Sequence, residues 1–502
     1  MAAMTETRTL EELGRAAGEL FIEVVGDPQV SVGGGAHDSR EVTPGSLFFC
    51  VAGERDDGHD FATQAVQAGA AALCVERRVD VDVPQLVVRK VREAMPLVGA
   101  ALYGNPGEQL VMLGVTGTNG KTTTTYLLDA IARADGRTTG LIGTIETRVG
   151  NEVRPGVRTT PESLDLQKLL AEMLVAGVDT VSMEVTSHAL VLNRVDGLRF
   201  SSAGFTNLTQ DHLDFHEDME EYFAAKASLF TPQRAERGAV NVDDPYGQRI
   251  KEASGISCVG FGRVESAEVR VSEVELEPTG SRFTVVTPKG ETQLSTSLVG
   301  PFNVSNCLTA TAIALQAGIG LDAIERGIAS LRTVPGRFES VDAGQPFAVV
   351  VDYAHTPDSL DNVLVAARRV AALKGGRVIT VFGCGGDRDR GKRPLMGMAA
   401  ARGADYLIVT SDNPRSEVPE AIVGEILEGV RAVSAEGPDA ALVDRRAAIE
   451  HALAEARPDD VVVIAGKGHE TGQQFADRTI PFDDRVVARE TLATLGWESS
   501  GD

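Results

Sequence analysis

The sequence has few cysteines, and their positions match neither a disulfide framework nor a zinc site. The 502 residues include five of them, Cys50, Cys74, Cys258, Cys307 and Cys384. The number is odd, the spacing is wide and no CxxC pair occurs, which excludes the patterns of small secreted domains and of structural zinc sites. This cysteine usage is typical of a reducing compartment.

Long apolar runs and an excess of basic residues are also missing. No apolar run approaches the ~18 residues that cross a bilayer, and the N-terminus carries acidic and polar side chains where a signal peptide needs an apolar stretch. We therefore expect a cytoplasmic protein that does not insert into membranes. The chain has 48 basic and 72 acidic residues, a net charge of −24. A field of that sign repels nucleic acids and anionic lipid surfaces, so neither is expected as a partner.

The composition that remains is that of a folded α/β protein. With 43% hydrophobic residues and about 150 residues per domain, the chain predicts about three domains. Apolar runs without polar alternation are typical of strands buried on both faces, as in parallel sheets covered by helices. Each run ends in Gly, Ser, Thr, Asp or His, so ligands are expected at these strand ends. The runs are residues 110–117, 179–187, 347–355, 376–386, 404–412 and 459–468.

We predict domains at residues 1–95, 96–333 and 334–502. The first holds an apolar strand followed by an Ala-rich helix at 61–73. The second holds a glycine-rich loop and a hairpin within 268–290 that turns at Pro-Thr-Gly. The third begins at a Pro-Gly break and continues as strand–helix units.

The glycine-rich loop has the layout of a phosphate-binding loop. A strand runs into Thr116-Gly-Thr-Asn-Gly-Lys-Thr122, and a helix follows at 123–134. Backbone N–H groups would face the phosphates, Lys121 would reach the terminal ones, and the Thr122 hydroxyl could hold Mg²⁺. Val115 occupies the place of the first glycine in the common GxxxxGK[ST] spacing.

Together with this loop, other segments resemble the superfamily of Mur ligases and folylpolyglutamate synthetases, and most of all the diaminopimelate-adding members of the Mur ligase family. These segments are DSR (38–40), TTP (159–161), MEVTSH (183–188), FTNLTQDHLDFH (205–216), YFAAK (222–226), FNVSN (302–306), PGRFE (335–339), VDYAHTPDSL (351–360), CGGDRDRGKRP (384–394), DNPR (412–415) and GKGHE (466–470).

The resemblance implies a three-domain Mur ligase architecture, with a central P-loop ATPase-like parallel sheet and a Rossmann-like C-terminal domain. It implies a monomer in which the three domains bind UDP-substrate, ATP and amino acid in that order. The implied reaction uses ATP and Mg²⁺ to add diaminopimelate to the D-Glu side-chain carboxylate of UDP-MurNAc-L-Ala-D-Glu, through an acyl phosphate, in peptidoglycan precursor synthesis.

The implied catalytic residues are Lys121, Glu184, His212 and Lys226. Thr122, Glu184, His212 and a carbamate on Lys226 would hold the metal. Without the resemblance, Glu184 also fits a cap of the next helix. His212 with Asp211, Asp214 and His216 also fits a hydrolase metal cluster, which would leave the phosphate loop without a role.

Lys226 falls in a helical pattern, where a lysine is usually solvated. The resemblance implies that it is carbamylated to N6-carboxylysine. That reaction needs a neutral amine, hence a lowered pKa, which burial can supply.

Further positions are carried over residue by residue. Thr186 replaces a common Ser, and Leu192 stands where some members have Gln, so one substrate contact is expected to be lost or moved. Asp352 and His355 also fit a helix N-cap region before Pro357, and Arg337 also fits an exposed linker. ATP would contact Gly117, Thr118, Asn119, Gly120, Lys121, Thr122, Thr123, Asn306, Arg337, Asp352 and His355. UDP-MurNAc-dipeptide would contact Ser39, Thr159, Thr160, Thr186 and Arg194.

The amino-acid site is expected in the last domain. Diaminopimelate differs from lysine by a distal carboxylate, which an arginine can bind bidentately. Lysine-adding members lack the arginine of DNPR, here Arg415, and Glu470 would pair with the distal ammonium; alone, Glu470 also fits a helix-start acid. The sequence does not distinguish meso- from LL-diaminopimelate. The implied residues are Arg388, Asp412, Asn413, Pro414, Arg415, Gly466 and Glu470.

Two other functions fit parts of the sequence. A folylpolyglutamate synthetase shares the chemistry, but DSR, TTP and DNPR count against it. A nucleotide-dependent switch would bind without catalysis, but the intact Lys121, Thr122, Glu184 and His212 count against it. Despite the acidic total, the site segments include a local group of cations at Arg388, Arg390, Lys392 and Arg393. Salt screens distant charges over about 8–10 Å, so a basic cleft is compatible with an acidic exterior.

Overall fold

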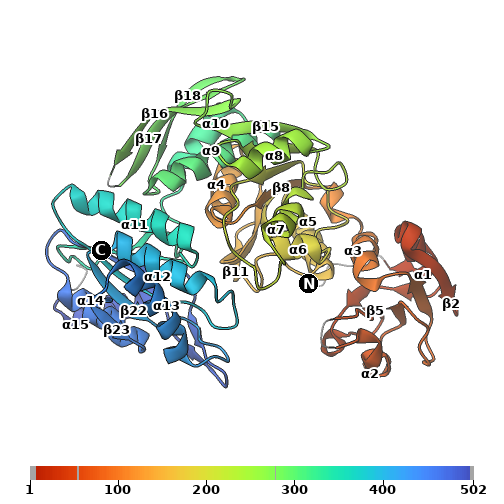
Figure 1. Cartoon of the computed structure of the whole chain (residues 1–502). Helices are drawn as coiled ribbons and strands as arrows, with labels where there is room; N and C mark the ends of the chain where they lie inside the picture. Colours follow the sequence, from red (N-terminus) through yellow and green to blue (C-terminus); the bar gives the residue numbers. More distant parts are fainter. Residues whose placement is uncertain (1–6, 54–55, 278, 498–502) are drawn as a thin grey trace.

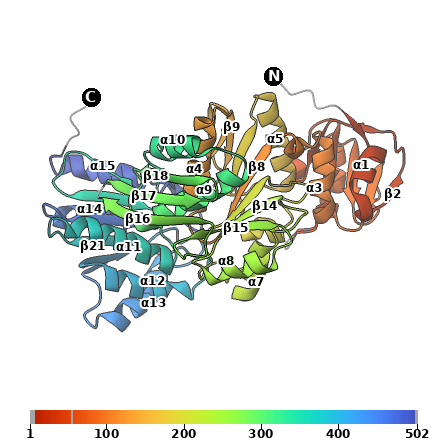
Figure 2. The same ribbon diagram turned by 90° about the horizontal axis from the view of Figure 1, so that it is seen from above.

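The computed structural model describes residues 7–53, 56–277 and 279–497. Its three main sheets lie in a row, each with helices on both faces (Figures 1 and 2). This arrangement confirms the predicted α/β class. In the described part of the chain, no helix is both long and apolar enough to cross a membrane.

The N-terminal sheet has the order β2-β7-β6-β5-β4 and is parallel except for β2. The predicted Ala-rich helix at 61–73 is too long, because Gly69 turns the chain with φ +106° and Ala72–Val75 enters the sheet as buried strand β6. The elements are β1 (Arg8–Thr9), α1 (Leu10–Ala16), β2 (Phe21–Val25), β3 (Ser31–Val32), β4 (Gly34–Ala36), β5 (Ser46–Phe49), α2 (Ala62–Gln67), β6, β7 (Gln85–Val88) and α3 (Val91–Leu102).

The central sheet has the order β11-β10-β9-β12-β8-β13-β14-β15-β16-β17-β18, with parallel pairing from β9 to β16. The antiparallel pairing of β16 with β17 confirms the predicted hairpin, although Pro278 of its turn lies outside the described residues. The strands are β8 (Val111–Thr116), β9 (Thr139–Ile142), β10 (Glu146–Val149), β11 (Glu152–Pro155), β12 (Thr180–Glu184), β13 (Ser202–Phe205), β14 (Arg237–Asn241), β15 (Ser257–Gly262), β16 (Val269–Glu277), β17 (Gly280–Thr287) and β18 (Gly290–Thr296).

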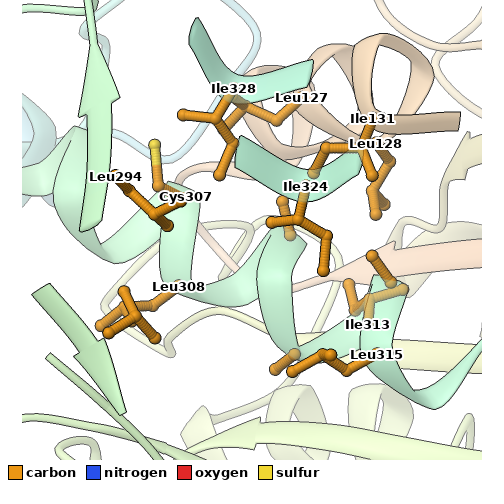
Figure 3. Packing of buried hydrophobic residues seen from close by; sticks show 14 of the residues in the cluster. Leu127, Leu128, Ile131, Leu294, Cys307, Leu308, Ile313, Leu315, Ile324 and Ile328 are labelled. Atoms are coloured by element: carbon orange, nitrogen blue, oxygen red, sulfur yellow. The ribbon is translucent and has the colours of Figure 1, made fainter. Parts of the chain in front are cut away.

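Helices cover both faces of this sheet. On one face, Leu127 and Ile131 of α4 pack against Ile324 and Ile328 of α10 and against α9 (Figure 3). Because α4 begins at Lys121, within the phosphate loop, this packing fixes the loop's position. The helices are α4 (Lys121–Ala134), α5 (Ser163–Val175), α6 (Ser187–Val191), α7 (Met219–Ala227), α8 (Pro245–Ala253), α9 (Pro301–Gln316) and α10 (Leu321–Ser330).

The C-terminal sheet has the order β19-β20-β24-β21-β22-β23 and is parallel except for β19. α11, α12 and α13 cover one face, and α14 and α15 the other. The elements are β19 (Glu339–Ser340), β20 (Ala348–Asp352), α11 (Pro357–Ala372), β21 (Val378–Phe382), α12 (Lys392–Gly403), β22 (Tyr406–Thr410), α13 (Pro419–Val433), β23 (Ala440–Leu442), α14 (Arg445–Glu455), β24 (Val461–Ala465), β25 (Gly472–Gln474), β26 (Thr479–Pro481) and α15 (Asp484–Thr494).

All six predicted buried runs are confirmed as parallel strands, namely β8, β12, β20, β21, β22 and β24. The proposed domain division at 95/96 falls inside α3, which packs on α1 of the first unit and on α5 of the second. The proposed division at 333/334 falls between α10 and β19.

The helices α4 and α10 approach each other closely, so we expect Gly327→Ala to destabilise the protein. A Cβ at Gly327 would lie 2.7 Å from the backbone nitrogen of Ile131, and overpacking of this kind costs about 1–3 kcal/mol. Urea unfolding should show this decrease in the free energy of unfolding. The matched control is Gly424→Ala in α13, where a Cβ meets nothing within 4 Å, and stability should rise by about 0.5–1 kcal/mol. Equal effects of the two substitutions would contradict the prediction.

Candidate functional site

A cavity of about 870 Å³ lies where the strand ends of the central sheet face the C-terminal unit. It contains the phosphate loop and side chains that follow β12, β13, β14 and β20, as the polar strand endings predicted. The predicted site residues that line it are Thr118, Asn119, Gly120, Lys121, Thr122, Thr123, Thr159, Thr160, Glu184, Thr186, Arg194, His212, Asn306, Arg337, Asp352 and His355.

The phosphate loop depends on two glycines with positive φ, +141° at Gly117 and +89° at Gly120. Side chains would be strained at these angles, and a Cβ at Gly120 would also collide with Asn306. Asn207 and Thr206, which follow β13, hold the loop through hydrogen bonds to Asn119 N (2.9 Å) and Asn119 O (2.6 Å). The loop is therefore held in shape by its neighbours in the sheet.

Lys121 and Lys226 flank the loop backbone. Lys121 Nζ donates to the carbonyls of Gly117 (3.0 Å) and Thr118 (2.8 Å), and Lys226 Nζ donates to the same Gly117 carbonyl (2.8 Å). Lys226 is 1% exposed and lies 4.6 Å from the Tyr222 ring centroid. Burial and the nearby Lys121 hold the pKa of Lys226 well below its usual range. Lys226 is therefore not the solvated lysine that is typical of a helix.

Glu184 faces Thr122. Its Oε2 accepts a hydrogen bond from Thr122 Oγ1 (3.1 Å), and its Oε1 accepts one from Thr144 N (2.8 Å). The following helix α6 is capped by Thr186, whose hydroxyl accepts from Ala189 N. The interpretation of Glu184 as a helix cap is therefore wrong, and the paired oxygens fit the ligands that Mg²⁺ prefers.

His212 adopts a positive φ of +55° and its ring lies 4.9 Å from that of His188. Burial lowers the pKa of His212 to about 3, so its imidazole is neutral and able to bind a metal ion. Asp214 is exposed, and His216 Nε2 lies 3.0 Å from Ser187 Oγ. Among the described residues, no group of three His, Cys, Asp or Glu side chains is placed to hold a metal ion.

Arg337 joins the C-terminal unit to the phosphate loop. Its Nη2 donates to Thr122 Oγ1 (2.9 Å), and its guanidinium lies 4.6 Å from the Tyr353 ring centroid. Its buried Nε has no hydrogen-bond partner among the described residues. Arg337 is therefore not an exposed linker residue, and it retains a donor for a ligand.

Asp352 and His355 lie between β20 and α11. The Asp352 carboxylate accepts from Phe338 N and Ala354 N, both at 2.7 Å. The cap of α11 is Thr356, not either of these residues. His355 Nε2 lies 3.8 Å from Asp211 Oδ2, which places it at the junction of the two units.

Three further polar contacts hold the C-terminal unit against the central one. Asn119 Nδ2 donates to Asp358 Oδ2 (2.8 Å). Lys392 Nζ lies 3.5 Å from Asp211 Oδ1, and Gln210 Nε2 lies 3.5 Å from Asp389 Oδ2. The unit interface therefore passes through the walls of the cavity.

Four of the five residues expected to hold the muramoyl-dipeptide line the cavity, namely Thr159, Thr160, Thr186 and Arg194. Thr160 Oγ1 donates to Glu184 O (2.8 Å), and Arg194 donates to Thr160 O (3.3 Å) while pairing with Glu162 (2.7 Å). Ser39 lies outside the cavity, in the short turn Ser39–Glu41 that Asp38 caps. Leu192 ends α6.

The predicted amino-acid residues form a second cluster outside the cavity, at the ends of β21, β22 and β24. Asn413 Nδ2 donates to Glu470 Oε2 (2.7 Å), and a Cβ at Gly466, where φ is +116°, would lie 2.5 Å from Asp412 Oδ2. Glu470 precedes β25 in a loop and begins no helix. The cluster borders the cavity, since the ring of the cavity-lining Tyr353 lies 5.1 Å from that of His469.

The two arginines of this cluster contact backbone carbonyls. Arg415, with φ +51°, donates from Nη1 to Gly386 O (2.6 Å). Arg388 donates to Asp387 O (2.9 Å) and is exposed. Pro414 lies directly beside Arg415 in the same turn.

Sequence reasoning missed Lys467, which is fully buried. Its Nζ donates to Asn413 Oδ1 (3.0 Å), Glu470 Oε2 (2.9 Å) and Gly472 O (2.7 Å). Its position in the GKGHE segment is the feature of the sequence that could have identified it. It also missed Thr144 and His188 in the cavity wall.

Arg390 and Arg393 are paired with carboxylates and do not serve as cations of the site. Arg393 has no exposed side-chain surface and pairs with Glu417 (2.7 Å) and Glu425 (2.8 Å). Arg390 also pairs with Glu425. The local cationic group expected in the cleft is therefore smaller than the sequence suggested.

Comparison with known proteins agrees with this geometry. The family "Mur ligase family, catalytic domain" matches residues 34–104, "Mur ligase middle domain" matches 115–314, and "Mur ligase, glutamate ligase domain" matches 336–468. A protein of Geobacillus thermodenitrificans named UDP-N-acetylmuramoyl-L-alanyl-D-glutamate–2,6-diaminopimelate ligase is 50% identical over 462 residues, which are 91% of this chain and 94% of that protein.

A protein of the same name from Streptomyces avermitilis is 49% identical over 491 residues, 96% of this chain and 95% of that one. A solved structure of a ligase of that name is 31% identical, covers 98% of this chain and 100% of its own, and has a TM-score of 0.69. The chain therefore belongs to the Mur ligase family.

Proposed function

We propose that this protein uses ATP to join diaminopimelate to the D-Glu side-chain carboxylate of UDP-MurNAc-L-Ala-D-Glu, releasing ADP and phosphate. The observation that carries the proposal is one cleft in which a phosphate loop meets the Thr122–Glu184 pair, bordered by a cluster that contains Arg415 and Glu470. The names of relatives at 46–50% identity support it. As proposed, it is a cytoplasmic monomer acting in peptidoglycan precursor synthesis.

The chemistry begins with two anions that repel each other. The D-Glu carboxylate attacks the γ-phosphorus of ATP, the bond to the β-phosphate oxygen breaks, and an acyl phosphate and ADP form. The diaminopimelate amine then attacks the acyl carbon, phosphate leaves, and the amine loses a proton. Cations and donors must therefore mask the charge on the phosphoryl group.

Lys121 and Arg337 are the cations placed for this task. Among the described residues, Lys121 Nζ donates to the loop carbonyls alone, and incoming phosphate oxygens would replace these carbonyls. Arg337 donates to Thr122 Oγ1 and keeps its buried Nε available, with no partner in the described ranges. Both charges act in a partly enclosed site, where they stabilise developing negative charge more strongly than in water.

Thr122, Glu184, His212 and a carbamate on Lys226 are proposed to hold Mg²⁺. When bound, the ion would supply charge neutralisation between the phosphates. The carbamate forms when the neutral Lys226 amine adds to CO₂ and releases a proton. The lowered pKa of Lys226 supports this step.

The remaining contacts are assigned by position. ATP would contact the loop from Gly117 to Thr123, of which residues 118–123 line the cavity, and Asn306, Asp352 and His355. The dipeptide would contact Thr159, Thr160, Thr186 and Arg194 in the same cavity. Ser39 in the unit proposed at 1–95 would meet the uridine end.

Amino-acid selection is proposed to rest on the second cluster. Arg415 would bind the distal carboxylate of diaminopimelate, with Arg388 and the turn Asp412–Pro414 beside it. Both bonds to Glu470 end on Oε2, and within the described residues Oε1 accepts none. That oxygen is available for the distal ammonium, over the backbone of Gly466.

Phosphate release from ATP tests the function directly. We expect release only when both UDP-MurNAc-L-Ala-D-Glu and diaminopimelate are present, and loss of release on chelation of Mg²⁺. A folylpolyglutamate synthetase would need neither compound, and a nucleotide-dependent switch would show little stimulation. Either result would contradict the proposal.

Arg415→Ala should abolish diaminopimelate use while largely sparing ATP binding. Truncating one partner of a buried charge pair costs about 2–5 kcal/mol, so kcat/KM for diaminopimelate should fall by roughly 30-fold or more. The control is Arg478→Ala, an exposed arginine between the paired strands β25 and β26 of the same unit. An unchanged apparent affinity of Arg415→Ala for diaminopimelate would refute the assignment.

Lys226→Ala should lower activity by about 10- to 100-fold, the range seen when groups supporting a metal site are removed. Acetate added in the assay should restore part of the activity, because it can occupy the place of the carbamate. Lys251→Ala, which removes a surface lysine paired with Glu268, should change nothing. Full activity of Lys226→Ala without added carboxylate would show that no carbamate is needed.

A further inference from the structure

Arg445 and Asp484 form an ion pair in which neither side chain is exposed. Arg445 begins α14 and Asp484 begins α15. The guanidinium binds the carboxylate with two parallel hydrogen bonds, Nε to Oδ1 at 2.8 Å and Nη2 to Oδ2 at 2.7 Å. This is the bidentate geometry that makes such pairs strong and directional.

The same guanidinium also binds two backbone carbonyls of the sheet. Nη1 donates to Ser411 O (3.2 Å) and Nη2 donates to Ala465 O (2.9 Å). Ser411 directly precedes Asp412, and Ala465 directly precedes Gly466. One buried side chain therefore fixes the two strand ends from which both segments of the amino-acid cluster start.

Beyond these strand ends the two segments are locked to each other. Lys467 Nζ bonds Asn413 Oδ1 and Glu470 Oε2, and Gln473 Nε2 donates to Asp412 O (2.7 Å). A Cβ at Gly466 would lie 2.5 Å from Asp412 Oδ2, so the contact has no spare room. A shift of either strand end would therefore move Arg415 relative to Glu470.

An apolar pair could fill the space of Arg445 and Asp484, and replacing buried ion pairs in that way is often neutral for stability. An apolar pair could not donate to Ser411 O and Ala465 O. Asp484 neutralises the guanidinium and leaves its other N–H groups for these carbonyls. The ion pair therefore fixes the positions of the two strand ends, which apolar packing alone would not do.

We propose that the Arg445–Asp484 pair is a positioning element for amino-acid selection, setting the separation of the Asp412–Arg415 and Gly466–Glu470 segments without touching substrate. The inference rests on the proposed function. Bidentate recognition of a carboxylate is sensitive to displacements of about 1 Å, which can cost up to about 100-fold in rate. The phosphate loop belongs to another sheet and should not respond.

The test compares charge removal at this pair with the loss of an arginine elsewhere in the sheet. The double variant Arg445→Met/Asp484→Leu leaves no lone buried charge, and Arg445→Lys keeps the charge but loses the fork. The matched control is Arg377→Met, because Arg377 pairs with Asp460 (2.7 Å) at the opposite ends of β21 and β24. Phosphate release gives KM for each of the three substrates, and circular dichroism monitors folding.

We expect the double variant to fold and its KM for diaminopimelate to rise at least about tenfold, with KM for ATP and for UDP-MurNAc-L-Ala-D-Glu unchanged. Preference for diaminopimelate over lysine should fall in parallel. Arg445→Lys should show a smaller rise, and Arg377→Met none.

An unchanged KM for diaminopimelate in both Arg445 variants, or equal rises for all three substrates, would overturn the proposal by showing a merely structural role. If the double variant does not fold, Arg445→Lys decides alone. Failure of the proposed function would appear earlier, as absence of diaminopimelate-dependent release by the wild type, and would remove this inference with it.

Discussion

The site depends on the Thr122 hydroxyl, which connects three segments that are distant in sequence. It donates to Glu184 at the end of β12 and accepts from Arg337 at the start of the C-terminal unit. The parallel pairing of β8 with β12 places Glu184 beside Val115, directly before the loop. The contacts of this one oxygen atom therefore depend on the local backbone geometry, on the register of the sheet and on how the C-terminal unit lies against the central one. A change in any of them would alter the site where phosphate and metal are expected.

The sequence predicted the buried frame of the fold well, because strands covered on both faces need continuous apolar runs. All six such runs are strands. The helix expected at 61–73 was too long because alanine fits helices and buried strands alike, and only the sheet partner decides that Ala72–Val75 is β6. The phosphate loop could be located because glycines, Lys121 and Thr122 are adjacent in sequence.

Contacts between distant segments could not be predicted. Glu184 was compatible with a helix cap until the structure placed Thr186 in that role. Arg393 was counted with the cleft cations, but its burial depends on Glu417 and Glu425, which lie on later segments. Lys467 and Arg445 are likewise defined by partners elsewhere in the chain. The net charge of −24 argues against a nucleic-acid partner, but it gave no information about which cations in the cleft are paired with carboxylates.

The contacts between the central and C-terminal units also affect how ligands would enter and leave the cavity. Asn119–Asp358 and Lys392–Asp211 cross the walls of the same cavity in which the triphosphate and the dipeptide would meet. Both contacts are polar, so water can take the place of either partner when they break. Under the proposed function, a nucleotide or nucleotide-sugar that enters or leaves this cavity would have to displace these contacts.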